Sequence, residues 1–177
     1  MLKFEAMQLR IEGDPSPEAW KRVQRYASWM RGVRVDERSH VVGDALYKLC
    51  FSSPAGGWFP ALQDLSWCIV ESNLPYVDLF VSPHLKKIYI YPPLWWIIPG
   101  IPPNHLAVIA STIIALPTSV LQSLCVDIRR AIPPTYLKDF LSSVVLRCGP
   151  SLVEFTSPIP LSNAATNHLI RLPHLHT

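Results

Sequence analysis

The chain is short of charge and of glycine. Only 16% of its 177 residues are charged, compared with roughly a quarter in typical soluble domains. Seven glycines stand against 18 prolines, which argues against flexible linkers and predicts stiff, sharply turned connections. The formal net charge is only +3 and the basic residues form no long run, so the sequence does not favour nucleic-acid binding.

Motifs of the common enzyme classes are missing as well. The sequence has no glycine-rich phosphate loop, no Gly-x-Ser-x-Gly elbow and no His-Glu-x-x-His pair. His168, His174 and His176 gather near the end, but a fourth ligand and a supporting shell are missing. We therefore expect no enzymatic activity, no cofactor and no bound metal.

Disulfide and export signals are absent too. The four cysteines are Cys50, Cys68, Cys125 and Cys148. Their wide, irregular spacing favours reduced, buried thiols over a disulfide framework or a zinc site. Charged residues interrupt any apolar run at the amino terminus, so no secretory signal opens the chain. We expect an intracellular protein, cytoplasmic or nuclear.

One segment is apolar enough to raise the question of a membrane. No Asp, Glu, Lys or Arg occurs from Ile88 to Val126, and residues 106–126 are long enough to cross a bilayer. Pro117 and Gln122 in the second half favour a buried helix followed by a buried strand. The alternative function is a membrane-associated protein anchored by residues 106–126.

What the chain does have is a returning pattern, Leu-x-x-Leu-x-Leu or an apolar variant, at intervals of 23 to 36 residues. The copies begin at Met30, Leu62, Leu85, Leu121 and Leu152, and a sixth would begin at Leu175. Alternate apolar positions are typical of a half-buried strand, and a period of this size is typical of a solenoid. We predict an α/β, leucine-rich-repeat-like solenoid whose parallel strands alternate with helices in about five to six irregular repeats.

In this interpretation the strands stack side by side in one sheet. The residues expected in register are Val33, Leu65, Ile88, Leu124 and Phe155. We expect the whole chain, residues 1–177, to form one domain that is incomplete at both ends, since it stops abruptly at the start of a sixth copy. Neither terminus carries a polar capping unit, so we also expect exposed apolar surface.

Helical patterns lie between the strands. They predict helices over residues 17–29, 42–49, 104–116, 134–148 and 163–172, and one or two turns over 74–80. Ser16, Ser39 and Ser162 are the expected caps. Proline stands two residues before the first leucine of four copies, at Pro60, Pro83, Pro150 and Pro173. We expect each proline to end a helix and force an extended approach to the strand.

Two stretches do not fit the repeat. Residues 2–9 resemble the strand of an earlier copy. Residues 92–103, with Trp95 and Trp96, look like an insertion. The tryptophan pair either covers the open side of the stack or anchors a partner, since tryptophan is enriched at binding hot spots.

Residues 16–176 resemble the leucine-rich-repeat region of F-box proteins of mushroom-type (basidiomycete) fungi. The matching stretches are AWKRVQRYASWMRGVRV, FPALQDLSW, LFVSPHLKKIYI and LIRLPHL. The resemblance implies the substrate-recognition part of an F-box adaptor of a cullin-type ubiquitin ligase. Residues 1–14 do not supply the F-box itself, so the ligase's adaptor subunit is an expected partner only if an F-box lies upstream.

The candidate binding residues are the strand positions that point away from the core and line a shared concave face. They are Arg34, Asp36, Asp64, Ser66, Lys87, Tyr89, Tyr91, Asp127 and Glu154, together with Cys125 and Thr156. Tyrosines flanked by charges of both signs are typical of a protein-binding strip. The expected partner is a target protein of unknown identity; the alternative is that this face is only solvated.

Overall fold

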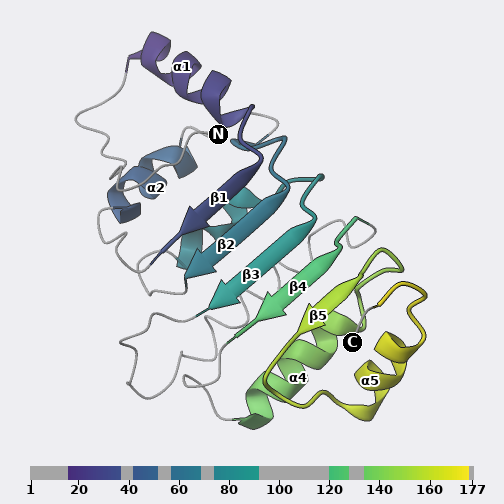
Figure 1. Cartoon of the computed structure of the whole chain (residues 1–177). Helices are drawn as coiled ribbons and strands as arrows, with labels where there is room; N and C mark the ends of the chain where they lie inside the picture. Colours follow the sequence, from purple (N-terminus) through teal and green to yellow (C-terminus); the bar gives the residue numbers. More distant parts are fainter. Residues whose placement is uncertain are drawn as a thin grey trace.

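The computed structural model describes residues 16–36, 42–51, 57–68, 74–91, 120–127 and 134–175. Within these ranges five strands form one open sheet (Figure 1). They are β1 (Gly32–Val35), β2 (Asp64–Cys68), β3 (Lys87–Tyr91), β4 (Ser123–Val126) and β5 (Glu154–Thr156). Every pairing is parallel, and the order across the sheet is the order along the chain. The expected α/β arrangement of parallel strands alternating with helices is confirmed.

The helices of the described residues are α1 (Pro17–Ala27), α2 (Val42–Phe51), the 3₁₀ helix η1 (Leu74–Phe80), α4 (Pro134–Val145) and α5 (Asn163–Ile170). Figure 1 shows η1 and α4 behind the sheet, with α1 and α5 beyond its two edges. The face turned toward the viewer carries no helix of the described residues. The expectations for residues 2–9, Ser39, 92–103 and 104–116 lie outside the described residues.

The apolar side chains form the ladders that the repeat predicts. Val33, Leu65, Ile88, Leu124 and Phe155 are register partners from β1 to β5, as expected. A second ladder joins Val35, Trp67, Ile90 and Val126. A third set comes from the turns before the strands, where Leu62, Leu85, Leu121 and Leu152 are almost completely buried. The apolar side chains of neighbouring strands therefore shield one another from water, and the core is continuous across the sheet.

Successive units are joined by the same backbone contact, four times over. In each, one carbonyl oxygen accepts two N–H groups from the following unit at 2.7–3.0 Å. The accepting residues are Arg31, Gln63, Lys86 and Gln122, and the donors are residues 63 and 64, 86 and 87, 122 and 123, and 153 and 154. The sheet is therefore set in register just before each strand begins, although the connections differ in length.

The prolines before the strands lie in turns, whereas the sequence predicts an extended approach to each strand. In three of the four pairs the leucine N–H donates to the residue before the proline, so that Phe59, Ser82 and Gly149 accept from Leu62, Leu85 and Leu152. Proline at the second position of a four-residue turn has the φ angle that such a turn requires. At Pro60, Pro83 and Pro150 the expected extended approach is therefore wrong: the chain turns sharply there, and the leucine that follows is buried in the core.

Two serine caps are confirmed. The Oγ of Ser16 accepts the N–H of Ala19 at 3.2 Å, and the Oγ of Ser162 accepts the N–H of Ala165 at 3.3 Å. Helices α1 and α5 end two residues before the expected positions, because their last N–H groups reach carbonyls three residues back instead of four.

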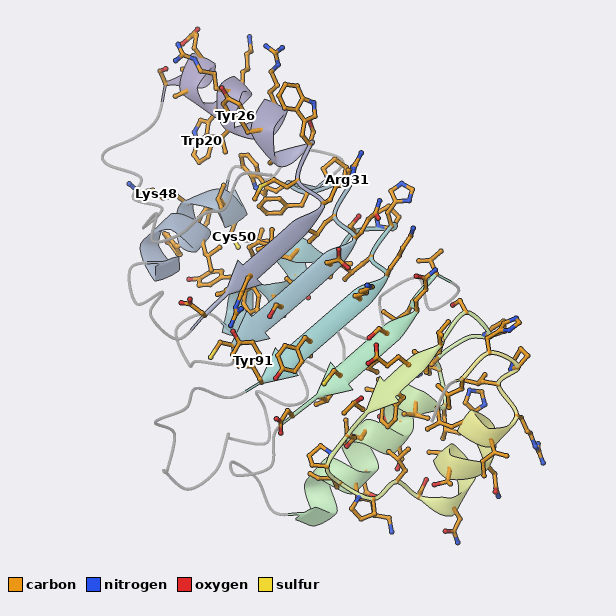
Figure 2. The ribbon with its side chains drawn as sticks, in the orientation of Figure 1. Trp20, Tyr26, Arg31, Lys48, Cys50 and Tyr91 are labelled. Atoms are coloured by element: carbon orange, nitrogen blue, oxygen red, sulfur yellow. The ribbon has the colours of Figure 1, made fainter. Side chains whose placement is uncertain are left out.

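Helix α1 is held by a pair of tryptophans. The rings of Trp20 and Trp58 lie 5.3 Å apart, and the Trp58 Nε1 donates to the Leu49 carbonyl at 2.8 Å. Figure 2 shows Trp20 on the side of α1 that faces α2. One buried indole therefore ties the first helix to the second.

The possible membrane segment lies largely outside the described residues. Its last residues, Ser123–Val126, form strand β4 in the middle of the sheet. No helix within the described ranges combines the length and the apolar character that crossing a membrane requires.

The ladder predicts which substitutions damage stability. Leu65→Ala and Leu124→Ala each leave a cavity in a shared core and should lower the free energy of unfolding by about 2–5 kcal/mol. Lys87→Ala, on the exposed side of β3, should change it by less than about 0.5 kcal/mol. Urea unfolding of the three variants measures the difference. Greater damage from Lys87→Ala would contradict the register.

Candidate protein-binding face

The face of the sheet without described helices, called the bare face below, is built from rows of register partners. The first row runs through Asp64, Lys87, Ser123 and Glu154. The second runs through Arg34, Ser66, Tyr89, Cys125 and Thr156. At the carboxyl ends, Tyr91 is the partner of Cys68, and Asp36 and Asp127 directly follow β1 and β4. The residues expected on this face are therefore brought together on one side of one sheet.

The rows differ in character. Opposite charges, Asp64 and Lys87, are neighbours on adjoining strands of the first row. In the same row the Ser123 Oγ donates to the Glu154 carboxylate at 2.8 Å, which joins β4 to β5. The second row has tyrosine at its centre and small side chains on either side. The amino end of the face is therefore ionic, and its middle is aromatic.

Two tyrosines form the most prominent feature of the bare face. Tyr89 and Tyr91 follow each other on the same side of β3, and their rings stack at 4.9 Å with an interplanar angle of 20°. Tyr89 is 40% exposed, whereas Tyr91 is half-buried. The pair offers a partner one accessible ring that rests on a second, fixed ring.

Tyr91 is fixed by contacts across two strands. Its hydroxyl donates to the Val35 carbonyl on β1 at 3.5 Å, so the ring passes over β2 (Figure 2). Its register partner on β2, Cys68, is completely buried on this face. A hydrogen bond between the Arg34 guanidinium and the Tyr91 hydroxyl, helped by the nearby Asp36, raises the pKa of Arg34 above its ordinary value. The Tyr91 ring therefore lies across β2 on the bare face, and Arg34 keeps its positive charge.

Tyr89 lies in a different environment. Partial burial, with further contributions from Cys125 and the Asp127 carboxylate, raises the pKa of its hydroxyl above the usual value. Its hydroxyl therefore stays neutral, and available as a hydrogen-bond donor, throughout the physiological range.

The bare face is acidic. Its cations are Arg34 and Lys87. Its carboxylates are Asp36, Asp64, Asp127 and Glu154, which leaves a formal charge of −2 on a chain whose total is +3. The sign of the bare face is thus opposite to that of the whole chain.

Sequence reasoning missed two members of this face. Ser123 links β4 to β5, and its position one residue before the strand leucine is the position that Lys87 and Asp64 occupy in their copies. The repeat itself therefore contained the signal. Cys68 lies in the same alternation, where it is the register partner of Tyr91 and is completely buried.

The other candidate chemistry is dispersed. All four cysteines are free thiols, and burial raises the pKa of the Cys148 thiol to about 11. One ring nitrogen of His168 lies 2.9 Å from the Cys148 carbonyl, a contact that ties α5 to the end of α4. The described residues contain no cluster of three metal-binding side chains. The comparisons with known protein families, curated proteins and solved structures gave no match.

The pKa of Tyr89 predicts an alkaline effect on stability. Because the folded state favours the neutral phenol, this contribution is fully present below about pH 10 and is lost as the pH rises through the folded-state pKa. Tyr89→Phe has no proton to lose, so its free energy of unfolding should fall less than that of the wild type between about pH 9 and pH 11. Urea unfolding at both pH values tests this. Equal losses would contradict the environment described for Tyr89.

Proposed function

We propose that the chain is a leucine-rich-repeat-like scaffold that binds a segment of another protein on its bare face. The observation that carries this proposal is the continuous set of in-register polar and aromatic side chains that no described helix covers. A parallel sheet is usually covered on both faces, so a bare one is a surface available to a partner.

The order of the strands supports a solenoid over a doubly wound fold. Doubly wound sheets reverse their strand order at a switch point and place helices on both faces. Here the order β1 to β5 never reverses, and the same two-donor contact recurs between successive units. Each unit therefore adds to the last in one direction, as in repeat proteins.

The dimensions suit an extended peptide. Five strands at about 4.8 Å spacing make a face about 19 Å across. An extended chain covers this distance with about six residues. The acidic excess of the face and the exposed Tyr89 ring favour a segment with a lysine or arginine, whose cation can lie over the ring near the Asp127 and Glu154 carboxylates.

The resemblance to fungal F-box proteins gives this binding a context. As the recognition part of an F-box adaptor, the scaffold would hold a target protein for a cullin-type ubiquitin ligase, and the ligase's adaptor subunit would bind an F-box upstream. The free thiols support the intracellular location that such a role requires. Coexpression of the full-length gene product with that adaptor subunit, followed by co-purification, tests the docking half separately.

Tyr89→Ala tests the bare face directly. A displayed library of random peptides is selected on the full chain, and the enriched peptides are measured against the variant by fluorescence anisotropy. We expect basic peptides to dominate, and the variant to bind them at least about tenfold more weakly, as for an aromatic hot spot. The melting temperature should change little, because Tyr89 is partly exposed.

Tyr47→Ala is the matched control, since Tyr47 is an exposed tyrosine on α2. It should bind the selected peptides like the wild type. Undiminished binding by Tyr89→Ala would show that recognition occurs elsewhere. Tyr91→Ala is less informative, because Tyr91 also covers Cys68 and contacts β1.

A further inference from the structure

The positive charge of this chain is concentrated at one place. Residues 16–31, which contain α1 and the turn after it, have four cations and one carboxylate. They are Lys21, Arg22, Arg25 and Arg31 against Glu18, a net charge of +3. This equals the net charge of the whole chain, so the remaining residues carry equal numbers of cations and carboxylates. Three of these four cations, Lys21, Arg22 and Arg25, lie on α1, and Arg31 follows it directly.

Helix α1 has two stripes at helical spacing. Trp20 and Ala27 turn inward, where Trp20 packs on Trp58 and Ala27 is buried. The second stripe, hereafter the α1 stripe, consists of Arg22, Arg25, Tyr26 and Trp29, which follow the spacing i, i+3, i+4 and i+7. All four are exposed. The helix is therefore already anchored by its first stripe, and the α1 stripe is left without a role in the core.

The exposed rings on the α1 stripe are large and organised. Tyr26 is 63% exposed and Trp29 is 60% exposed. Their rings meet edge to face at 6.0 Å, and the Arg25 guanidinium lies 5.3 Å from the centre of the Trp29 ring. Figure 2 shows Tyr26 on α1, well away from the bare face on which Tyr91 lies. Two aromatic rings and the Arg25 guanidinium are thus held together on the outside of the molecule.

We propose that the α1 stripe is a second docking surface, which takes an acidic segment of a partner protein. Tryptophan, tyrosine and arginine are the residues that dominate protein-binding hot spots. The local charge of +3 attracts carboxylates, and arginine forms two parallel hydrogen bonds with a carboxylate. Helices that lie on membranes carry their basic residues and their tryptophans on opposite faces. Here arginines and aromatic rings share one stripe, with Arg25 against the Trp29 ring, which favours a protein partner over a membrane surface.

This site is independent of the proposed function. The bare face carries a formal charge of −2 and the α1 stripe lies in a region of +3, so the two surfaces attract segments of opposite sign. A substitution that weakens binding at one of the two surfaces should therefore leave binding at the other unchanged.

The test uses a short fluorescein-labelled peptide of alternating glutamate and leucine, and measures anisotropy with the full chain at low salt. We expect binding, and at least a tenfold loss in Arg22→Glu/Arg25→Glu. Arg147→Glu/Arg171→Glu is the matched control, because it reverses two exposed cations outside α1 and gives the same total charge. It should stay within about twofold of the wild type if the effect is local, since screening limits long-range attraction.

The aromatic part of the α1 stripe has its own control. Tyr26→Ala/Trp29→Ala should weaken the same peptide severalfold, whereas Tyr47→Ala/Phe51→Ala, which removes another exposed pair on α2, should not. Circular dichroism verifies that each variant is folded. Equal losses in the matched pairs, or no binding of the peptide at all, would overturn the proposal. So would selective binding of phosphatidylserine vesicles or a thymidine oligonucleotide that Arg22→Glu/Arg25→Glu abolishes while the peptide stays unbound.

Discussion

The structure depends on apolar side chains that lie in register on one side of a parallel sheet. No strand of three to five residues can shield its own leucines from water, but each is flanked by the equivalent side chain of the next unit. This constraint fixes the alternation along every strand. The apolar side chains of each strand all point to the core side of the sheet. The polar and aromatic residues that alternate with them therefore lie on the other side.

The same constraint explains why repeats of unequal length are tolerated. What must be constant is the approach to each strand, where one carbonyl accepts two N–H groups and a turn brings a leucine into the core. The rest of a unit varies between a 3₁₀ helix of seven residues and an α-helix of twelve. Neighbouring turns are also joined by side chains, as where the Ser82 and Ser151 hydroxyls donate to the Pro60 and Leu121 carbonyls. Both of these helices, η1 and α4, lie behind the sheet, on the side away from the bare face (Figure 1).

Much of this was readable from the sequence, because the strand period and the helix caps are local signals. The five register partners from Val33 to Phe155, and the caps at Ser16 and Ser162, follow from spacing alone. The turns at Pro60, Pro83 and Pro150 were not, since proline suits both an extended chain and a turn, and the burial of the following leucine in the shared core is a tertiary effect. Tyr91 shows a second limit. Alternation places it on the bare face, but its reach across β2 to Val35 needs coordinates.

The distribution of charge over the molecule follows neither from the composition alone nor from the fold alone. A net charge of +3 on 177 residues suggests a nearly neutral surface, yet within it the bare face carries −2 and residues 16–31 carry +3. Since the two regions are tied to one core by the Trp20–Trp58 contact and the strand ladder, their separation is fixed by the fold. The two proposed docking surfaces would then hold partners of opposite charge at a defined distance without competing for one site. A single parallel sheet whose strand order follows the chain is suited to this, because it converts sequence position into spatial order.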